Sequence, residues 1–178
     1  IKTATSYYLN KGSQIDLDAI IAKVGLPCFV KPNNAGSSFG ISKAYSINEM
    51  MPAIQKAFEQ DSEILIESFL EGSEVSVGVI QYQQTLKVLP ITAIVSENDF
   101  FDYEAKYQGK SSEITPAVLS PEIQEKVVFT AKKVYNSLNL SGFSRAEFIL
   151  VEGEPYFLEI NTVPGLTEES ILPQQAAC

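Results

Sequence analysis

The chain has 178 residues, of which 45% are hydrophobic and 20% charged, proportions typical of a soluble globular protein with an ordinary buried core. Its formal net charge of -9 argues against binding to nucleic acids or membranes, because such binding depends on clusters of lysine and arginine. The absence of histidine excludes Ser-His and Cys-His nucleophilic catalysis, and the two cysteines, Cys28 and Cys178, indicate neither a disulfide framework nor a zinc motif. No apolar run approaches the roughly 20 residues of a membrane span and no signal peptide is apparent, so we expect a cytoplasmic protein.

Apolar residues recur at helical or alternating spacing along most of the sequence. In chain order we predict a helix over residues 14–24, strands over 29–31 and 41–45, a helix over 47–60, strands over 63–68, 74–81 and 85–95, a helix over 121–138, and strands over 143–151 and 155–160. Ser46 and Glu49 match the capping box, in which the serine hydroxyl and the glutamate carboxylate bind free backbone N–H groups at a helix start.

Two stretches stand apart from this pattern. Residues 33–40 are mostly small, and we expect a hairpin tip there whose backbone N–H groups could lie over phosphates, although a plain hairpin tip is the commoner interpretation. Residues 96–116 show no periodic signal. Such a long irregular stretch inside a compact domain is more often functional or mobile than accidental.

Glu159 and Asn161 are the most informative pair in the sequence. Residues two apart on a strand point the same way, so their oxygens lie side by side, and oxygen ligands suit Mg²⁺ that also binds substrate phosphates. The metal hypothesis needs Glu147 on the same face as Glu159, and a three-residue loop over 152–154 would pair them. That loop would also pair Arg145 with Asn161, whereas a two-residue loop would turn Glu147 to the other face. The alternative is that these acids form the solvated face of an antiparallel sheet.

Five short motifs occur in a fixed order along the chain. They are Val30-Lys31-Pro32, Gly36-Ser37-Ser38-Phe39-Gly40-Ile41-Ser42-Lys43, Leu65-Ile66-Glu67, Tyr103-Glu104-Ala105-Lys106-Tyr107, and Leu158-Glu159-Ile160-Asn161-Thr162-Val163-Pro164-Gly165-Leu166-Thr167. Together they resemble the D-alanine:D-alanine ligases of the ATP-grasp superfamily, from about residue 24 to residue 173. The resemblance implies an α+β fold with two lobes whose antiparallel sheets enclose ATP. It places the small lobe at 25–70 and the large lobe at 71–178, with 1–24 as a remnant leading into them.

The resemblance also implies a role for each matching residue. ATP would be bound by Lys31 and Lys106 at the phosphates, by Ser38, by Glu67, Ser68 and Leu70 at the adenine, by Glu74 at the ribose, and by Phe100 and Leu158 flanking the base. Two Mg²⁺ ions, with Mn²⁺ as an alternative, would be held by Glu147, Glu159 and Asn161. The catalytic and amino-acid-binding residues would be Ser37, Tyr107, Arg145, Gly165 and Ser170.

The implied reaction makes D-alanyl-D-alanine for peptidoglycan precursors. The carboxylate of the first D-alanine attacks the γ-phosphate of ATP, and the amine of the second D-alanine then attacks the resulting acyl phosphate. Arg145 and the backbone N–H of Gly165 would stabilise the negative charge that builds up on oxygen, and Ser170 would receive the carboxylate of the second D-alanine. No histidine is needed, because no protein nucleophile takes part.

The irregular stretch 96–116 would form a lid that excludes water from the acyl phosphate. A hydrogen bond from Tyr107 to Ser37 would latch this lid. Tyr107 also favours an amine as second substrate, because related ligases that use D-lactate tend to have histidine there.

The sequence departs from the family at several points. Glu147 occupies a position that is usually aspartate, and Glu169 one that is often histidine. We expect a fragment, inactive alone, that lacks the family's N-terminal domain and the helix after Pro173, and whose full-length form is a homodimer. The alternatives are another ATP-grasp carboxylate-amine ligase, or a nucleotide-binding module without chemistry.

Overall fold

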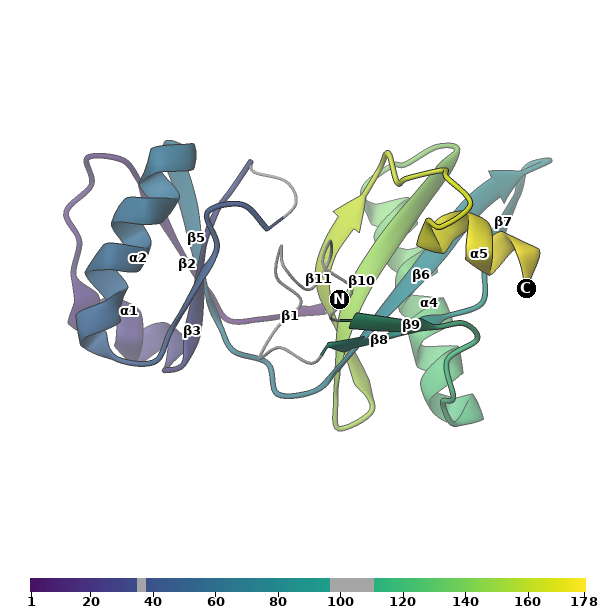
Figure 1. Cartoon of the computed structure of the whole chain (residues 1–178), viewed down its shortest axis with the longest axis horizontal. Helices are drawn as coiled ribbons and strands as arrows, with labels where there is room; N and C mark the ends of the chain where they lie inside the picture. Colours follow the sequence, from purple (N-terminus) through teal and green to yellow (C-terminus); the bar gives the residue numbers. More distant parts are fainter. Residues whose placement is uncertain (35–37, 97–110) are drawn as a thin grey trace. The chain divides into compact units, whose positions relative to one another are not determined.

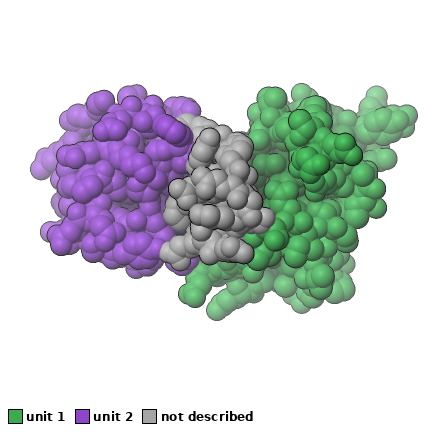
Figure 2. Space-filling view, in the orientation of Figure 1, with its two compact units in different colours: residues 1–3, 71–100, 109–178 green, residues 4–70, 101–108 purple. Residues whose placement is uncertain are grey.

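The computed structural model describes residues 1–34, 38–96 and 111–178 (Figure 1). They form two compact units, unit 1 with residues 1–3, 71–96 and 111–178, and unit 2 with residues 4–34 and 38–70 (Figure 2). The chain passes from unit 2 to unit 1 between Leu70 and Glu71, and residues 4–24, predicted as a remnant, lie within unit 2. Within the described ranges, no helix has both the length and the apolar character that crossing a bilayer requires.

Unit 2 is a four-stranded antiparallel sheet with two helices packed against it. The strand order is β2 (Ser6–Asn10), β5 (Glu63–Ser68), β3 (Cys28–Pro32) and β4 (Ser42–Ala44). Helices α1 (Leu17–Val24) and α2 (Ile47–Gln60) cover one face of this sheet (Figure 1). Alternation along β3 buries Cys28 and Val30 under the helices, so Phe29 and Lys31 belong to the opposite face.

The helices of unit 2 begin at polar caps. Helix α2 has the predicted bounds, but the predicted capping box is wrong in detail, because the Ser46 hydroxyl donates to Glu49 at 2.9 Å instead of accepting from a backbone N–H. The other oxygen of Glu49 accepts from the N–H of Tyr45 at 2.9 Å. Helix α1 begins later than predicted, since Asp16 caps it by accepting from the N–H of Ala19 at 3.0 Å.

Unit 1 is built on a mixed sheet with seven described strands. The order is β1 (Lys2–Thr3), β11 (Glu154–Asn161), β10 (Phe143–Val151), β6 (Ser73–Tyr82), β8 (Thr92–Ser96) and β9 (Ser111–Ile114), and β7 (Thr85–Val88) also pairs with β6. Only β1 and β11 pair in parallel among these described strands. Helix α4 (Pro121–Ser137) packs against the face that carries Val75, Val77 and Phe148. The other face carries Glu74, Ser76 and Gly78 by alternation.

Three elements differ from the prediction for physical reasons. Residues 85–95 form two strands rather than one, because Pro90 lacks an N–H for the sheet. Residues 111–114, predicted as irregular, become β9 by pairing with β8. Helix α5 (Ile171–Ala177) is present, although the helix after Pro173 was expected to be missing; its proline lies in the first turn, where no internal N–H bond is lost.

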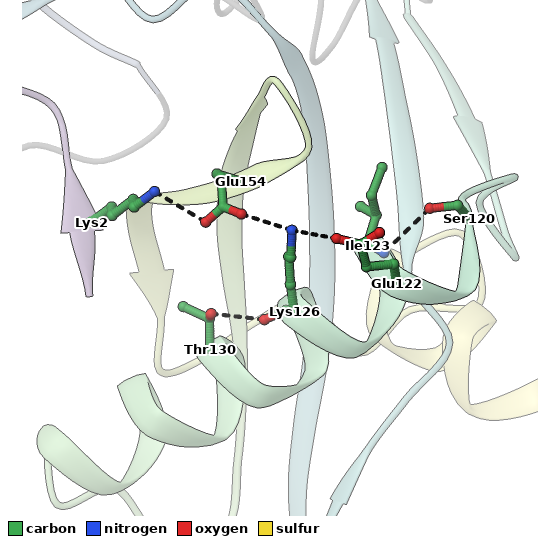
Figure 3. A network of polar contacts seen from close by, with 7 residues as sticks. All are labelled: Lys2, Ser120, Glu122, Ile123, Lys126, Thr130 and Glu154. Atoms are coloured by element: carbon green, nitrogen blue, oxygen red, sulfur yellow. Dashed lines mark hydrogen bonds and ion pairs between the residues drawn. The ribbon is translucent and has the colours of Figure 1, made fainter.

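A chain of ion pairs joins the edge strand β1 to helix α4 (Figure 3). Lys2 Nζ lies 3.0 Å from Glu154 Oε2, and Lys126 Nζ lies 2.8 Å from Glu154 Oε1 and 2.8 Å from Glu122 Oε1. Hydrogen bonds from Lys126 and then Lys2 hold the pKa of Glu154 below its ordinary value. Each exposed pair contributes little alone, so the main effect of the network is to fix β1 and α4 on β11.

Candidate functional site

The hairpin of β10 and β11 places the predicted metal ligands on one face. Glu147 pairs directly with Glu159, and Arg145 pairs with Asn161. This pairing was predicted and is confirmed, but the predicted three-residue loop is wrong. Val151 pairs with Glu154, so the turn has two residues, and both adopt the positive φ that such tight hairpins require.

A β-bulge at Leu158 reconciles the short turn with the observed pairing. A two-residue turn alone would bring Leu158 opposite Glu147. The ladder shifts between Glu147 and Phe148, so that Leu158 is an extra residue and Glu159 reaches the position opposite Glu147. Bulges of this kind are found near active sites, where they redirect a side chain. Leu158, predicted to flank the adenine, thus lies next to the acid pair.

Glu147 lies in an unusual electrostatic setting. Glu147 is only 6% exposed, and Arg145 Nη2 donates to Glu147 Oε1 at 2.8 Å. Burial raises the pKa of Glu147 well above its ordinary range, and the hydrogen bond and negative charge of Glu159 raise it further, while Arg145 opposes the shift. A buried carboxyl facing a second carboxyl is not a solvated sheet face, which argues against the alternative interpretation of these acids.

The surroundings of the acid pair fit a hard cation. Ser76 lies opposite Glu147 on β6, and both its buried hydroxyl and the buried Nε of Arg145 have no hydrogen-bond partner among the described residues. Asn161 Oδ1 accepts from the N–H of Val163 at 3.0 Å, which holds the amide at the start of the turn. The described residues contain no group of three or more His, Cys, Asp or Glu side chains arranged to hold a metal, so the donor set is two carboxylates and one amide oxygen. That set suits Mg²⁺ shared with phosphates, not a closed protein cage.

The turn after β11 brings Gly165 and Ser170 together. An added Cβ at Gly165 would lie 2.6 Å from Ser170 Oγ, so no larger side chain fits there without movement. Ser170 precedes helix α5, yet its hydroxyl makes no capping bond and instead lies 2.8 Å from the hydroxyl of Thr167. Gly165, predicted to contact the reacting oxygen, and Ser170, predicted to bind the second amino acid, are therefore neighbours. Thr167, whose hydroxyl contacts that of Ser170, was not predicted as a site residue.

In unit 2, Lys31 forms an ion pair with Glu67. Both side chains are largely buried, and they belong to the sheet face opposite the helices. The ring of Phe69 lies 6.2 Å from that of Phe29, and the ammonium of Lys43 lies 4.0 Å from the Phe69 centroid. A charged pair beside two tilted aromatic rings and a cation is chemistry suited to a nucleotide.

The remaining predicted residues are less informative. Ser68 ends β5, and its hydroxyl accepts from the N–H of Thr5 at 3.1 Å. Leu70 is the last described residue of unit 2. Ser38 has a positive φ of 58°, and Glu74 lies on β6 two residues before Ser76. Ser37, Phe100, Lys106 and Tyr107 lie outside the described residues, as does most of the predicted lid. Ser76 was missed, although its alternation with Glu74 on a predicted strand could have identified it.

Comparison with known proteins places this geometry in a family. The sequence model described as "D-ala D-ala ligase C-terminus" matches residues 5–178. The D-alanine–D-alanine ligase of Flavobacterium johnsoniae is 66% identical over 176 residues, which cover 99% of this chain and 54% of the relative. The chain thus spans about half the length of the curated relatives it matches.

Two solved structures share the fold. The D-alanine–D-alanine ligase from Bacillus anthracis complexed with ATP is 30% identical with a TM-score of 0.83, over 99% of this chain and 55% of that chain. The VanG D-Ala:D-Ser ligase from Enterococcus faecalis is 34% identical with a TM-score of 0.83, over 98% and 52%. The predicted α+β, ATP-grasp fold is confirmed by these matches. From the match over residues 5–178 it follows that the chain belongs to the family of D-alanine:D-alanine ligase C-terminal domains.

Proposed function

We propose that the full-length protein containing this chain joins two D-alanines with ATP to give D-alanyl-D-alanine, a peptidoglycan precursor, in the cytoplasm. In this proposal the chain supplies nucleotide-binding residues, the metal ligands and part of the site for the second amino acid. The observation that carries the proposal is the register of β10 and β11, which brings Arg145, Glu147, Glu159 and Asn161 onto one face.

The reaction has two steps that both build negative charge on oxygen. A carboxylate oxygen of the first D-alanine bonds to the γ-phosphorus as the bond to ADP breaks, and the amine of the second D-alanine then bonds to the carbonyl carbon as phosphate leaves. Arg145 and the N–H of Gly165 would stabilise the charged oxygens. Bound Mg²⁺, held by Glu147, Glu159 and Asn161, would neutralise phosphate charge and orient the γ-phosphate. Ser170 would bind the carboxylate of the second D-alanine.

Unit 2 would contribute to ATP recognition. The Lys31–Glu67 pair is mostly withdrawn from water, so its charges interact more strongly than an exposed pair would. A phosphate would attract the Lys31 ammonium, which frees Glu67 to accept a hydrogen bond from an adenine amino group.

The direct test uses the full-length protein. D-alanine-dependent release of ADP and phosphate is expected from the wild type, with a loss of at least about a hundredfold in Glu159→Gln, because that change removes one of two carboxylate ligands. Glu154→Gln is the matched control, since Glu154 lies on the same strand but pairs with Lys2 and Lys126. Absence of D-alanine-dependent turnover in a folded wild type would reject the proposal.

A nucleotide-binding module without chemistry is the competing function. In that case Lys31→Ala would weaken ATP binding, and no D-alanine-dependent product would form in any variant. Lys11→Ala is the control, because the Lys11 ammonium donates to the backbone carbonyl of Phe58 at 3.1 Å, away from Lys31 and Glu67, and the alanine keeps the backbone bond to Ser62. Product analysis with D-alanine, D-serine and D-lactate as second substrates separates this ligase from other carboxylate-amine ligases.

A further inference from the structure

Gln175 on helix α5 is a buried amide with three specific partners. The residue is 1% exposed and lies on the same side of the unit 1 sheet as Gly78. Its Oε1 accepts from the N–H of Gly78 at 2.9 Å, and its Nε2 donates to the carbonyl of Ser76 and to Thr92 Oγ1, each at 2.9 Å. Both donors and the acceptor of the amide are thus used, as burial requires.

The amide fills a gap in the backbone ladder. Strand β6 pairs with β7 through Val79 and Val88, the N–H of Leu89 donates to Gly78, and pairing resumes with Ser76 opposite Thr92. Three residues on the β7–β8 side therefore face two residues on β6. The N–H of Gly78 and the carbonyl of Ser76 lie in this gap, and the side-chain amide of Gln175 takes the place of a peptide group.

Gly78 permits this close approach. An added Cβ at Gly78 would lie 2.8 Å from Gln175 Oε1 and 2.5 Å from Leu172 Cδ1, both too short for an ordinary contact. Leu172 packs against the sheet without directional contacts, so apolar packing alone would let helix α5 slide. Three hydrogen bonds to fixed atoms remove that freedom.

The braced part of β6 is the part that supports the acid pair. Across the β6–β10 ladder, Gly78 pairs with Arg145 and Ser76 pairs with Glu147. At its other end, helix α5 begins directly after Ser170. Gln175 therefore links the strand beside Arg145 and Glu147 to the helix that begins directly after Ser170.

We propose that Gln175 is a positioning residue that fixes Ser170 relative to Arg145 and Glu147, so that the second amino acid is held at the reacting carbonyl. This inference rests on the proposed ligase function. Gln175 touches no substrate and acts only through the helix. Small displacements of a substrate-binding group can cost a large factor in rate, which is why a rigid connection matters here.

The test uses the full-length enzyme with Gln175→Met, which keeps the length of the side chain and removes its hydrogen bonds. We expect the D-alanine concentration for half-maximal rate at the second site to rise about tenfold, equivalent to about 1.4 kcal/mol, while the Kd for ATP changes less than about twofold. Tyr135→Phe is the matched control, because it removes a 3.0 Å bond to the carbonyl of Gly142 within the same unit but on the α4 face. It should leave both constants unchanged.

A double-mutant cycle with Ser170→Ala separates positioning from general stability. If Gln175 acts through Ser170, Gln175→Met adds less than about twofold in the Ser170→Ala background. The inference would be overturned by full additivity, by equal changes in the Kd for ATP and the half-saturating D-alanine concentration, or by equal effects of Gln175→Met and Tyr135→Phe. Wild-type activity would still support the ligase function in each of these cases. A wild type without D-alanine-dependent turnover would overturn both.

A second measurement applies if Gln175→Met does not fold. In the wild-type chain, the amide proton of Gly78 should exchange slowly with solvent, because the side chain of Gln175 is its acceptor. Fast exchange of this proton in an otherwise protected β6 would overturn the inference without any variant.

Discussion

Replacing Gly165 by alanine tests how the turn after β11 and Ser170 depend on each other. The added Cβ would lie 2.6 Å from Ser170 Oγ, whereas ordinary contacts begin at 3.4 Å. The clash can be relieved by rotation of the Ser170 hydroxyl or by movement of the turn backbone. These two responses affect different kinetic constants, so the variant distinguishes them.

The magnitudes favour rotation of the hydroxyl. Rotation breaks the 2.8 Å contact between Ser170 and Thr167, and a hydrogen bond of this kind contributes roughly 0.5–1.5 kcal/mol. Moving a packed backbone typically costs about 1–3 kcal/mol. Because about 1 kcal/mol corresponds to roughly a fivefold change in affinity, the D-alanine concentration for half-maximal rate is expected to rise about fivefold, with kcat nearly unchanged.

Steady-state release of ADP by the full-length enzyme at saturating ATP measures both constants. Gly165→Ala and Ser170→Ala are expected to be non-additive, since both remove the same aligned hydroxyl. Tyr135→Phe is the control, because it removes only a 3.0 Å bond to the carbonyl of Gly142 on the α4 face, away from this turn. A fall in kcat of about a hundredfold at unchanged half-saturation would show that the backbone had moved, and would refute this reasoning.

Three further predictions concern stability and ionisation. The depressed pKa of Glu154 stabilises the fold above the unfolded-state pKa, and this gain is lost as pH falls through the lower folded-state pKa. Glu154→Gln is therefore expected to be less stable than wild type at neutral pH, and this difference in the free energy of unfolding should shrink in acid. Urea unfolding at a series of pH values measures the difference, and a value that does not change with pH would contradict the prediction. Phe148→Ala, at a fully buried core position, is expected to lower the free energy of unfolding by about 3–5 kcal/mol, and a loss below about 1 kcal/mol would contradict the packing described. A hydrogen bond with Glu63 raises the pKa of Tyr8 to about 12, so Glu63→Gln is expected to lower it in an NMR titration, and an unchanged value would exclude this cause.

The sequence could predict those elements whose signals lie within a single segment of the chain. Helix α2 has its predicted bounds because its apolar spacing and its polar start are contained within the segment itself. The pairing of Glu147 with Glu159 was predicted with the wrong turn, and the bulge at Leu158 supplies the residue that the turn lacks. Spacing in the sequence cannot distinguish an extra residue in a loop from an extra residue in a strand.

Contacts between distant segments were beyond sequence reasoning. Gln175 lies in a helix of seven residues, and no local pattern indicates that it completes a ladder 97 residues away at Gly78. Pro90 divides the strand that was predicted over 85–95, and both parts pair with the same neighbour, β6. Burial of Glu147 likewise depends on strands far along the chain, so its raised pKa could not be read from its own segment.

The pairing of β1 with β11 constrains the order in which the protein can fold. Lys2 pairs with Tyr156 and Thr3 with Phe157, so β1 cannot pair until the residues up to β11 have been synthesised. In the sequence, unit 2 lies between these two partners, and its described strands come from residues 4–70. During translation, unit 2 can therefore fold while β1 still lacks its partner β11, and the pairing of these two strands is a late event.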